Sequence, residues 1–174
     1  MARAVVITGG NAGDGEMLMA RAREEIGRRA GRIVAASSLR RTKAWGFEAP
    51  DFLNQALEIE TRLTPTELLD TLQGIENLLG RDREAEARSK RETGARYVSR
   101  TMDIDIIFYD ALTVAGERLT IPHPLLAVRR FVLEPLCEIC PGRVHPSEGV
   151  TVSELLARLD KAEAEEKENR ICEK

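Results

Sequence analysis

The chain has few aromatic residues, few cysteines and no long apolar run, and each shortage argues against a class of protein. Aromatic residues make up 4% of the sequence, too few for an RNA-binding module that displays stacking rings on its sheet. Three cysteines form an odd set in a chain without a secretory start, which argues against a disulfide framework. No run of 18 apolar residues is present, so we expect no membrane span and a cytoplasmic location.

Charge, length and composition favour one domain. A net charge of −3 argues against a general nucleic-acid or membrane binder. The 174 residues are 43% hydrophobic, enough to build one core, and no internal repeat or low-complexity linker divides them. We therefore expect a single, monomeric domain over residues 1–174, with a frayed helical tail from about 160 onwards.

Apolar periodicity and helix-capping signals predict alternating strands and helices. Strands are expected over residues 4–8, 32–39, 52–61 and 102–109, with a hairpin over 111–121. Helices are expected over about 16–29, from Pro65 after the capping box Thr64 to Glu67, over about 131–139, and from a second capping box at 151–154. Residues 40–50 and 81–100 are expected to be loops, the second of them long and mobile.

Two aspartates lie two residues apart in the predicted strand 102–109. Side chains alternate along a strand, so Asp103 and Asp105 share one face. The opposite face takes Met102, Ile104, Ile106 and Phe108. Two carboxylates at this spacing either hold hard cations such as Mg²⁺ or are solvated charges on an exposed face. Seven basic and four acidic residues in the preceding segment 81–100 suit a polyanion, with arginines holding phosphate oxygens and aspartates holding Mg²⁺.

Three large side chains outside this strand have more than one interpretation. Trp45 and Phe47 lie in a segment bounded by polar residues and a proline, where their rings either cover a ligand or cap the core. His123 lies between two prolines in a rigid setting that we expect to be exposed. Its imidazole could act as a general acid or base, donate to a phosphate, or be a plain surface residue.

Two further pairs of residues are interpreted as structural. Gln73 and Glu76 fall three apart on a predicted helix, and such a pair is solvated surface by default. Cys137 and Cys140 form a CxxC with no second pair, which favours two buried helix positions over a zinc or redox site.

Three segments together resemble a known family. SRTMDIDIIFYD, LTIPHPLL and RRFVLEPLCEICP are similar in order and spacing to the 6-hydroxymethyl-7,8-dihydropterin pyrophosphokinases of folate biosynthesis, and the resemblance covers roughly residues 37–146. It implies an α+β fold, a ferredoxin-like α/β/α sandwich with a mainly antiparallel sheet and helices on both faces. It also implies transfer of pyrophosphate from ATP to the pterin's hydroxymethyl oxygen, with release of AMP and with two Mg²⁺ ions as cofactors.

The resemblance also implies which residues form the site. The catalytic residues would be Arg81, Arg83, Arg96, Arg100, Asp103 and Asp105, the two aspartates being the metal ligands. ATP would contact Gln73, Glu76, Ile106, Arg118, Thr120, His123 and Arg129. The pterin would contact Thr42, Lys43, Trp45, Phe52, Asn54, Tyr97 and Phe131. The rival interpretations are a non-catalytic nucleotide- or RNA-binding module and another Mg²⁺-dependent phosphotransferase or nuclease that uses the same aspartates.

Overall fold

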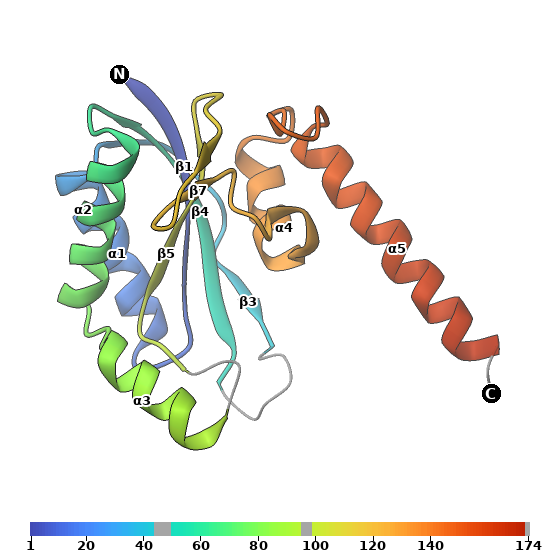
Figure 1. The fold of residues 1–174 in the computed structure, drawn as a ribbon, viewed down its shortest axis with the longest axis horizontal. Helices are drawn as coiled ribbons and strands as arrows, with labels where there is room; N and C mark the ends of the chain where they lie inside the picture. Colours follow the sequence, from blue (N-terminus) through green and yellow to red (C-terminus); the bar gives the residue numbers. More distant parts are fainter. Residues whose placement is uncertain (44–49, 95–98, 173–174) are drawn as a thin grey trace.

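The protein is described from a computed structural model, which describes residues 1–43, 50–94 and 99–172. An antiparallel sheet forms its centre (Figure 1). Its strands are β1 (Ala2–Gly10), β2 (Arg32–Ala36), β3 (Arg40–Thr42), β4 (Phe52–Thr61) and β5 (Asp103–Tyr109). The strand order is β2-β4-β1-β5, and the short β3 also pairs with β4.

Helices lie on both faces of this sheet (Figure 1). One face carries α1 (Gly15–Arg29) and α2 (Pro65–Leu78), and the other carries α4 (Arg130–Ile139) and α5 (Val152–Cys172). The remaining elements are α3 (Arg83–Thr93), a hairpin of β6 (Val114–Ala115) and β7 (Thr120–Ile121), and a 3-10 turn η1 (Leu126–Val128). Apart from β3, the main elements follow the β-α-β-β-α-β order of ferredoxin-like folds, so the expected fold class is confirmed.

Each face of the sheet has its own apolar core. Between the sheet and α1 and α2, buried side chains include Val6, Ile26, Leu57 and Leu72. Between the sheet and α4 and α5 they include Val5, Ile107, Phe108, Leu133 and Leu155. None of the helices in the described segments combines the length and the apolar character that a bilayer crossing requires.

The local signals that predicted α2 are present in the structure. Thr64 Oγ1 accepts the Glu67 N–H at 3.4 Å, and Glu67 Oε2 accepts the Thr64 N–H at 2.8 Å, which completes the capping box. Pro65 follows at the first helical position, where a backbone N–H would have no hydrogen-bond partner within the helix, so proline costs nothing there. The second capping box, between Thr151 and Glu154, begins α5 in the same way.

One predicted side-chain direction is wrong, because β5 contains an extra residue. Val5 of β1 pairs with Phe108 and Val6 pairs with Ile106, so Ile107 has no counterpart on β1. Beyond this bulge the alternation changes phase, and Phe108 joins Ile107 in the core beneath α4 and α5. Ile104 and Ile106 keep their expected face, toward α1 and α2.

The expected mobile loop over 81–100 is also wrong, because residues 83–93 form helix α3. The helix buries none of its residues, so apolar periodicity could not predict it. Its signals are at the ends: the Asp82 carboxylate accepts the Ala85 N–H at 2.9 Å, and Gly94 ends the helix with φ of 65°.

The C-terminal segment and the cysteines remain to be placed. The backbone of α5 is helical as far as Cys172, and both the fraying of residues beyond 160 and the single domain remain predictions.

Cys137 and Cys140 are free thiols, half-buried against the core beneath α4 and α5. Burial raises the pKa of both thiols, that of Cys140 to about 11, which disfavours reactive thiolates. The expected pair of buried helix positions is wrong in part, because Cys140 follows the last residue of α4 and neither residue is fully buried.

Candidate active site

A cavity of about 190 Å³ lies on the α4 side of the sheet, where strand ends meet the first turn of that helix. Its walls are formed by Ile7, Gly9, Thr42, Lys43, Phe52, Asn54, Arg100, Asp103, Asp105, Arg129 and Phe131. Nine of these eleven residues come from the sets implied by the resemblance. The structure therefore brings together residues from three predicted groups that lie far apart in the sequence.

The two aspartates share this cavity but have different partners. Asp103 Oδ1 lies 2.6 Å from Nη1 of Arg81, and Asp103 Oδ2 lies 2.7 Å from Nη1 of Arg100. Asp105 has no arginine within ion-pair distance among the described residues, although Nε2 of His123 lies 4.0 Å from its Oδ2. Burial, Asp103 and Glu76 together raise the pKa of Asp105 to about 7. The negative charge of the pair is thus compensated at Asp103 and uncompensated at Asp105.

This arrangement fits an open Mg²⁺ site. Mg²⁺ is commonly held by one or two carboxylates together with substrate phosphates and water. In the described part of the chain, no group of three or more His, Cys, Asp and Glu side chains is placed to hold a metal ion. Asp103 and Asp105 therefore suit a cation whose other ligands come with the substrate. The raised pKa of Asp105 agrees with this, since a cation beside it would favour the ionised carboxylate.

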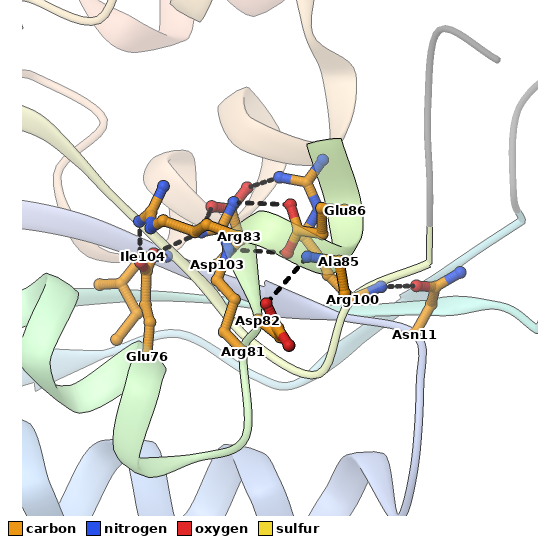
Figure 2. Close-up of polar contacts among 10 residues, drawn as sticks. All are labelled: Asn11, Glu76, Arg81, Asp82, Arg83, Ala85, Glu86, Arg100, Asp103 and Ile104. Carbon is orange, nitrogen blue, oxygen red and sulfur yellow. Dashed lines mark hydrogen bonds and ion pairs between the residues drawn. The ribbon is translucent and has the colours of Figure 1, made fainter. Parts of the chain in front are cut away.

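Glu76 of α2 is the centre of a buried ionic cluster (Figure 2). It is 1% exposed, so its interpretation as solvated surface is wrong. Its Oε1 accepts the Ile104 N–H at 2.7 Å and Nη1 of Arg81 at 2.8 Å, and its Oε2 pairs with Arg83. Burial raises the pKa of Glu76, while the N–H of Ile104 and the charge of Arg81 act in the opposite direction.

Arg81 connects this cluster to Asp103 and to α3. Its side chain is 6% exposed and lies between Glu76, Asp103 and Glu86, whose Oε1 is 2.9 Å from Nε of Arg81 (Figure 2). A guanidinium held by three carboxylates has a fixed orientation. Glu76 therefore acts on the aspartate pair through Arg81, and Glu86 does so from α3.

Gly10, the last residue of β1, and Asn11, which follows it, support Arg100, although the sequence patterns assigned neither a role. Asn11 Oδ1 accepts the Arg100 N–H at 3.0 Å, and the Arg100 carbonyl accepts the Asn11 N–H at 3.0 Å (Figure 2). At Gly10, an added Cβ would lie 2.2 Å from the Thr101 carbonyl oxygen, so only glycine allows this close approach. The sequence signal that could have identified these two residues is the Gly-Gly-Asn segment 9–11, which fits no phosphate-binding motif.

The half of the cavity away from the aspartates has polar and aromatic walls. Asn54 is buried at 4% exposure, and its Nδ2 donates to Thr42 Oγ1 at 3.1 Å. An added Cβ at Gly9 would lie 2.7 Å from Asn54 Oδ1, so this glycine provides the space that the amide occupies. Phe131 is 37% exposed, and the Arg129 guanidinium lies 5.6 Å from its ring centre. An amide and an accessible ring suit a flat, polar heterocycle.

Of the seven expected ATP residues, Arg129 lines the cavity and the other six do not. Glu76 lies in the ionic cluster and His123 lies beside Asp105, whereas the remaining four are on other parts of the fold. Ile106 is buried toward α1 and α2, and Gln73 is half-buried on α2. Arg118 and Thr120 are in the β6-β7 region, where Nη2 of Arg118 lies 2.5 Å from Oδ1 of Asp70. Their predicted contacts with ATP remain predictions.

His123 is less exposed than expected. Its side chain is 20% exposed, and burial, followed by the charge of Arg129, lowers its pKa. Its Nδ1 accepts the Leu125 N–H at 3.2 Å, so the proton of the neutral ring is on Nε2, the nitrogen nearer Asp105. The setting disfavours the plain-surface interpretation. Trp45, Phe47, Arg96 and Tyr97 lie outside the described residues.

Known proteins resemble the chain in sequence. A family described as 7,8-dihydro-6-hydroxymethylpterin-pyrophosphokinase (HPPK) matches residues 5–141. A protein of Methylorubrum extorquens, named 2-amino-4-hydroxy-6-hydroxymethyldihydropteridine pyrophosphokinase, is 42% identical over 162 residues, which are 92% of this chain and 95% of that protein. A Bacillus subtilis protein of the same name is 39% identical over 139 residues, 79% of this chain and 77% of that one.

Solved structures also resemble the chain. A crystal structure of HPPK-DHPS in complex with substrates superposes with a TM-score of 0.70 at 14% identity, and covers 94% of this chain and 44% of that one. A Plasmodium falciparum HPPK-DHPS triple mutant with pteroate gives a TM-score of 0.72 at 14% identity, with coverage of 95% and 44%. The chain thus spans less than half of those two proteins, and at such identity the likeness shows the fold alone. With the family match over residues 5–141 and relatives up to 42% identical, the chain belongs to the 7,8-dihydro-6-hydroxymethylpterin-pyrophosphokinase family.

Proposed function

We propose that the chain transfers the pyrophosphoryl group of ATP to the hydroxymethyl oxygen of 6-hydroxymethyl-7,8-dihydropterin and releases AMP. The observation that carries the proposal is one cavity in which an aspartate pair and an arginine lie beside amide, hydroxyl and aromatic side chains. The first group suits a metal-bound triphosphate, and the second suits a flat heterocycle that forms hydrogen bonds. The two relatives described above are named as pyrophosphokinases of this pterin, which supports the same reaction.

The pterin is proposed to bind between Asn54 and Phe131. The Asn54 amide, oriented by Thr42, hydrogen-bonds the edge of the ring, and Phe131 stacks on one of its faces. Phe52 and Lys43 complete this wall of the cavity. Trp45 and Tyr97 are proposed to contact the pterin as well.

The triphosphate is proposed to bind against Asp103 and Asp105. Two Mg²⁺ ions held there would neutralise charge on the phosphate oxygens and lower the pKa of the attacking hydroxyl. Arg81 and Arg100, which donate to Asp103, would donate to phosphate oxygens once that carboxylate binds a cation. The hydroxymethyl oxygen loses its proton to solvent and bonds to the β-phosphorus, the bond from that phosphorus to the α,β-bridging oxygen breaks, and AMP leaves with the electron pair of that bond.

The other site residues surround this reaction centre. His123 and Arg129 are proposed to contact the phosphates beside Asp105, and Glu76 is proposed to orient Arg81 and Arg83. Further contacts with ATP are proposed for Gln73, Ile106, Arg118 and Thr120, and Arg96 is proposed as a further catalytic arginine. We also propose that the protein acts as a monomer in the cytoplasm, on these two small molecules and not on nucleic acids.

The proposal is tested by incubating the protein with ATP, Mg²⁺ and 6-hydroxymethyl-7,8-dihydropterin and separating the nucleotides. AMP should form in amounts equal to the pterin diphosphate, and only when the pterin is present. Formation of ADP would indicate transfer of a single phosphoryl group and would overturn the proposal. Nucleotide cleavage that does not depend on the pterin would instead indicate a hydrolase.

A further inference from the structure

A continuous chain of ion pairs joins two walls of the cavity from outside it. Arg40 of β3 contacts two acids of α4, with Nε 2.7 Å from Oε1 of Glu138 and Nη1 2.8 Å from Oε2 of Glu134. The other oxygen of Glu134 lies 3.3 Å from Nη1 of Arg130, at the start of α4. Glu134 therefore bridges an arginine next to the Thr42 wall and an arginine next to the Phe131 wall.

The same chain of ion pairs continues from α4 to α5. Arg130 pairs with Asp160, and its Nε and Nη2 lie 3.4 and 2.9 Å from the two carboxylate oxygens of Glu163. Apolar packing of α5 uses Val152, Leu155, Leu156 and Leu159, all before these acids. Among the described side chains of α5 beyond Leu159, Asp160 and Glu163 make polar contacts with another element, and both of them pair with Arg130.

Arg130 lies between two residues of the cavity wall. Arg129, immediately before it, and Phe131, immediately after it, both line the cavity. The Arg129 carbonyl accepts the N–H groups of Val132 and Leu133 at 3.0 Å each, which forms the first turn of α4. Any loosening of this turn therefore displaces both Arg129 and Phe131. The ion pairs that hold Arg130 from outside the cavity keep the turn from loosening.

We propose that Asp160 and Glu163 are positioning residues for the substrate cavity, and that they act through Arg130 on Arg129 and Phe131. That the ligand is the pterin rests on the proposed function. The link from the α5 acids through Arg130 to the first turn of α4 depends only on the ion pairs of the fold. Arg130 is 37% exposed, so each pair alone is weak, but three acids around one guanidinium form a network. Asp103 and Asp105 are on β5, outside this network, and saturating ATP compensates for a weaker contact of Arg129 with the phosphates. Loss of the network should therefore weaken pterin binding and leave the chemical step unchanged.

The test compares two variants of α5 that each remove two negative charges. Asp160→Asn/Glu163→Gln removes the negative charges of both ion pairs between α5 and Arg130. The control, Glu165→Gln/Glu166→Gln, changes exposed acids of the same helix, of which Glu165 lies 3.9 Å from Lys161. Steady-state AMP formation is measured against pterin concentration at saturating ATP, and amide hydrogen exchange at Val132 and Leu133 is measured by NMR.

In Asp160→Asn/Glu163→Gln, KM for the pterin should rise about fivefold with kcat within about twofold of wild type, since the loss is confined to binding. Exchange at Val132 and Leu133 should become faster, and the control should match wild type in both measurements. Arg130→Gln should raise KM similarly, and combining it with the α5 variant should add nothing further, because both remove one network.

Three outcomes would overturn the positioning role: unchanged KM and exchange in the α5 variant, a fall in kcat without a change in KM, or an equal rise in KM in the control. Failure of the proposed function is distinguished from these, because the wild-type protein would then form no pterin-dependent AMP. In that case, the amide exchange rates at Val132 and Leu133 alone test whether the α5 acids hold the first turn of α4. Unchanged rates in the α5 variant would exclude this role.

Discussion

At the scale of single residues, the two aspartates of β5 have the same chemistry and unequal surroundings. Asp103 receives two guanidinium groups, whereas the pKa of Asp105 is raised to about 7 by burial, Asp103 and Glu76. Asp105 therefore has more to gain from a bound cation. To bind the proposed Mg²⁺, Asp103 would have to exchange its arginine partners for the cation, which would free their donors for phosphate.

Asp105→Asn keeps the shape of the side chain and removes its charge. We expect kcat to fall by about 10²-fold or more, since a ligand of the reaction's charge-neutralising metal is lost. The midpoint of thermal unfolding should not fall, because the variant removes an uncompensated charge. Both quantities are measured beside Glu24→Gln, an exposed acid on α1. Turnover near the wild-type rate would exclude a metal role for Asp105.

Arg100→Ala removes a guanidinium that lies 2.7 Å from Asp103 and points into the cavity. We expect kcat to fall by about 10²-fold, a magnitude typical of losing one donor to developing charge. The control is Arg28→Ala, whose guanidinium contacts Glu25 on α1, away from the site. If both variants keep the wild-type kcat, Arg100 serves only to balance the charge of Asp103.

At the scale of elements, the N-terminus of α2 is determined by a local sequence signal, the capping box of Thr64 and Glu67. Thr64→Ala should lower the free energy of unfolding by about 1 kcal/mol, because the first turn loses the hydroxyl that accepts the Glu67 N–H. Urea denaturation measures the change. Thr71→Ala is the matched control, since its hydroxyl donates to the Glu67 carbonyl within the helix and alanine is the better helix former. Equal losses in both variants would argue against the cap.

Elements that depend on local signals were predictable, and features that depend on a distant partner were not. The capping box of α2, the strand 52–61 and the shared strand face of Asp103 and Asp105 follow from local sequence patterns. The burial of Glu76 depends on the Ile104 N–H and Arg81, which approach it only in the folded chain. Helix α3 lacks an apolar face, so its capping residues were the available signal.

At the scale of the whole molecule, the walls of the cavity belong to segments that meet only through long-range contacts. One such contact is Glu138 of α4, which accepts the Ser38 N–H at 2.7 Å and pairs with Arg40. The hydrogen bond from the Ser38 N–H, the one from Nε of Arg40 and the charge of Arg40 lower the pKa of Glu138. A carboxyl with a lowered pKa in the folded state stabilises the protein above its unfolded pKa, and this contribution disappears as pH falls through the folded value.

The comparison of wild type with Glu138→Gln tests this at several pH values. The variant should be less stable than wild type at pH 7, and the difference should shrink as pH falls below about 4, where the wild-type carboxyl becomes protonated. Urea denaturation from pH 3 to pH 7 gives the difference directly. Glu117→Gln, an exposed acid of the β6-β7 hairpin, should show no such dependence. A difference that does not vary with pH would mean that the carboxylate charge is not the stabilising feature.

The extra residue in β5 has a consequence for how this fold can vary. Before Ile107, the strand directs Asp103 and Asp105 toward the cavity; after it, the strand directs Tyr109 toward α2, where its hydroxyl donates to the Leu63 carbonyl. Asp105 and Tyr109 are four residues apart yet face opposite sides of the sheet, which a regular strand of the same length cannot provide. Loss of the bulge without a change in length would therefore displace either the aspartates or the tyrosine, whereas deletion of Ile107 itself would restore regular alternation with both in place.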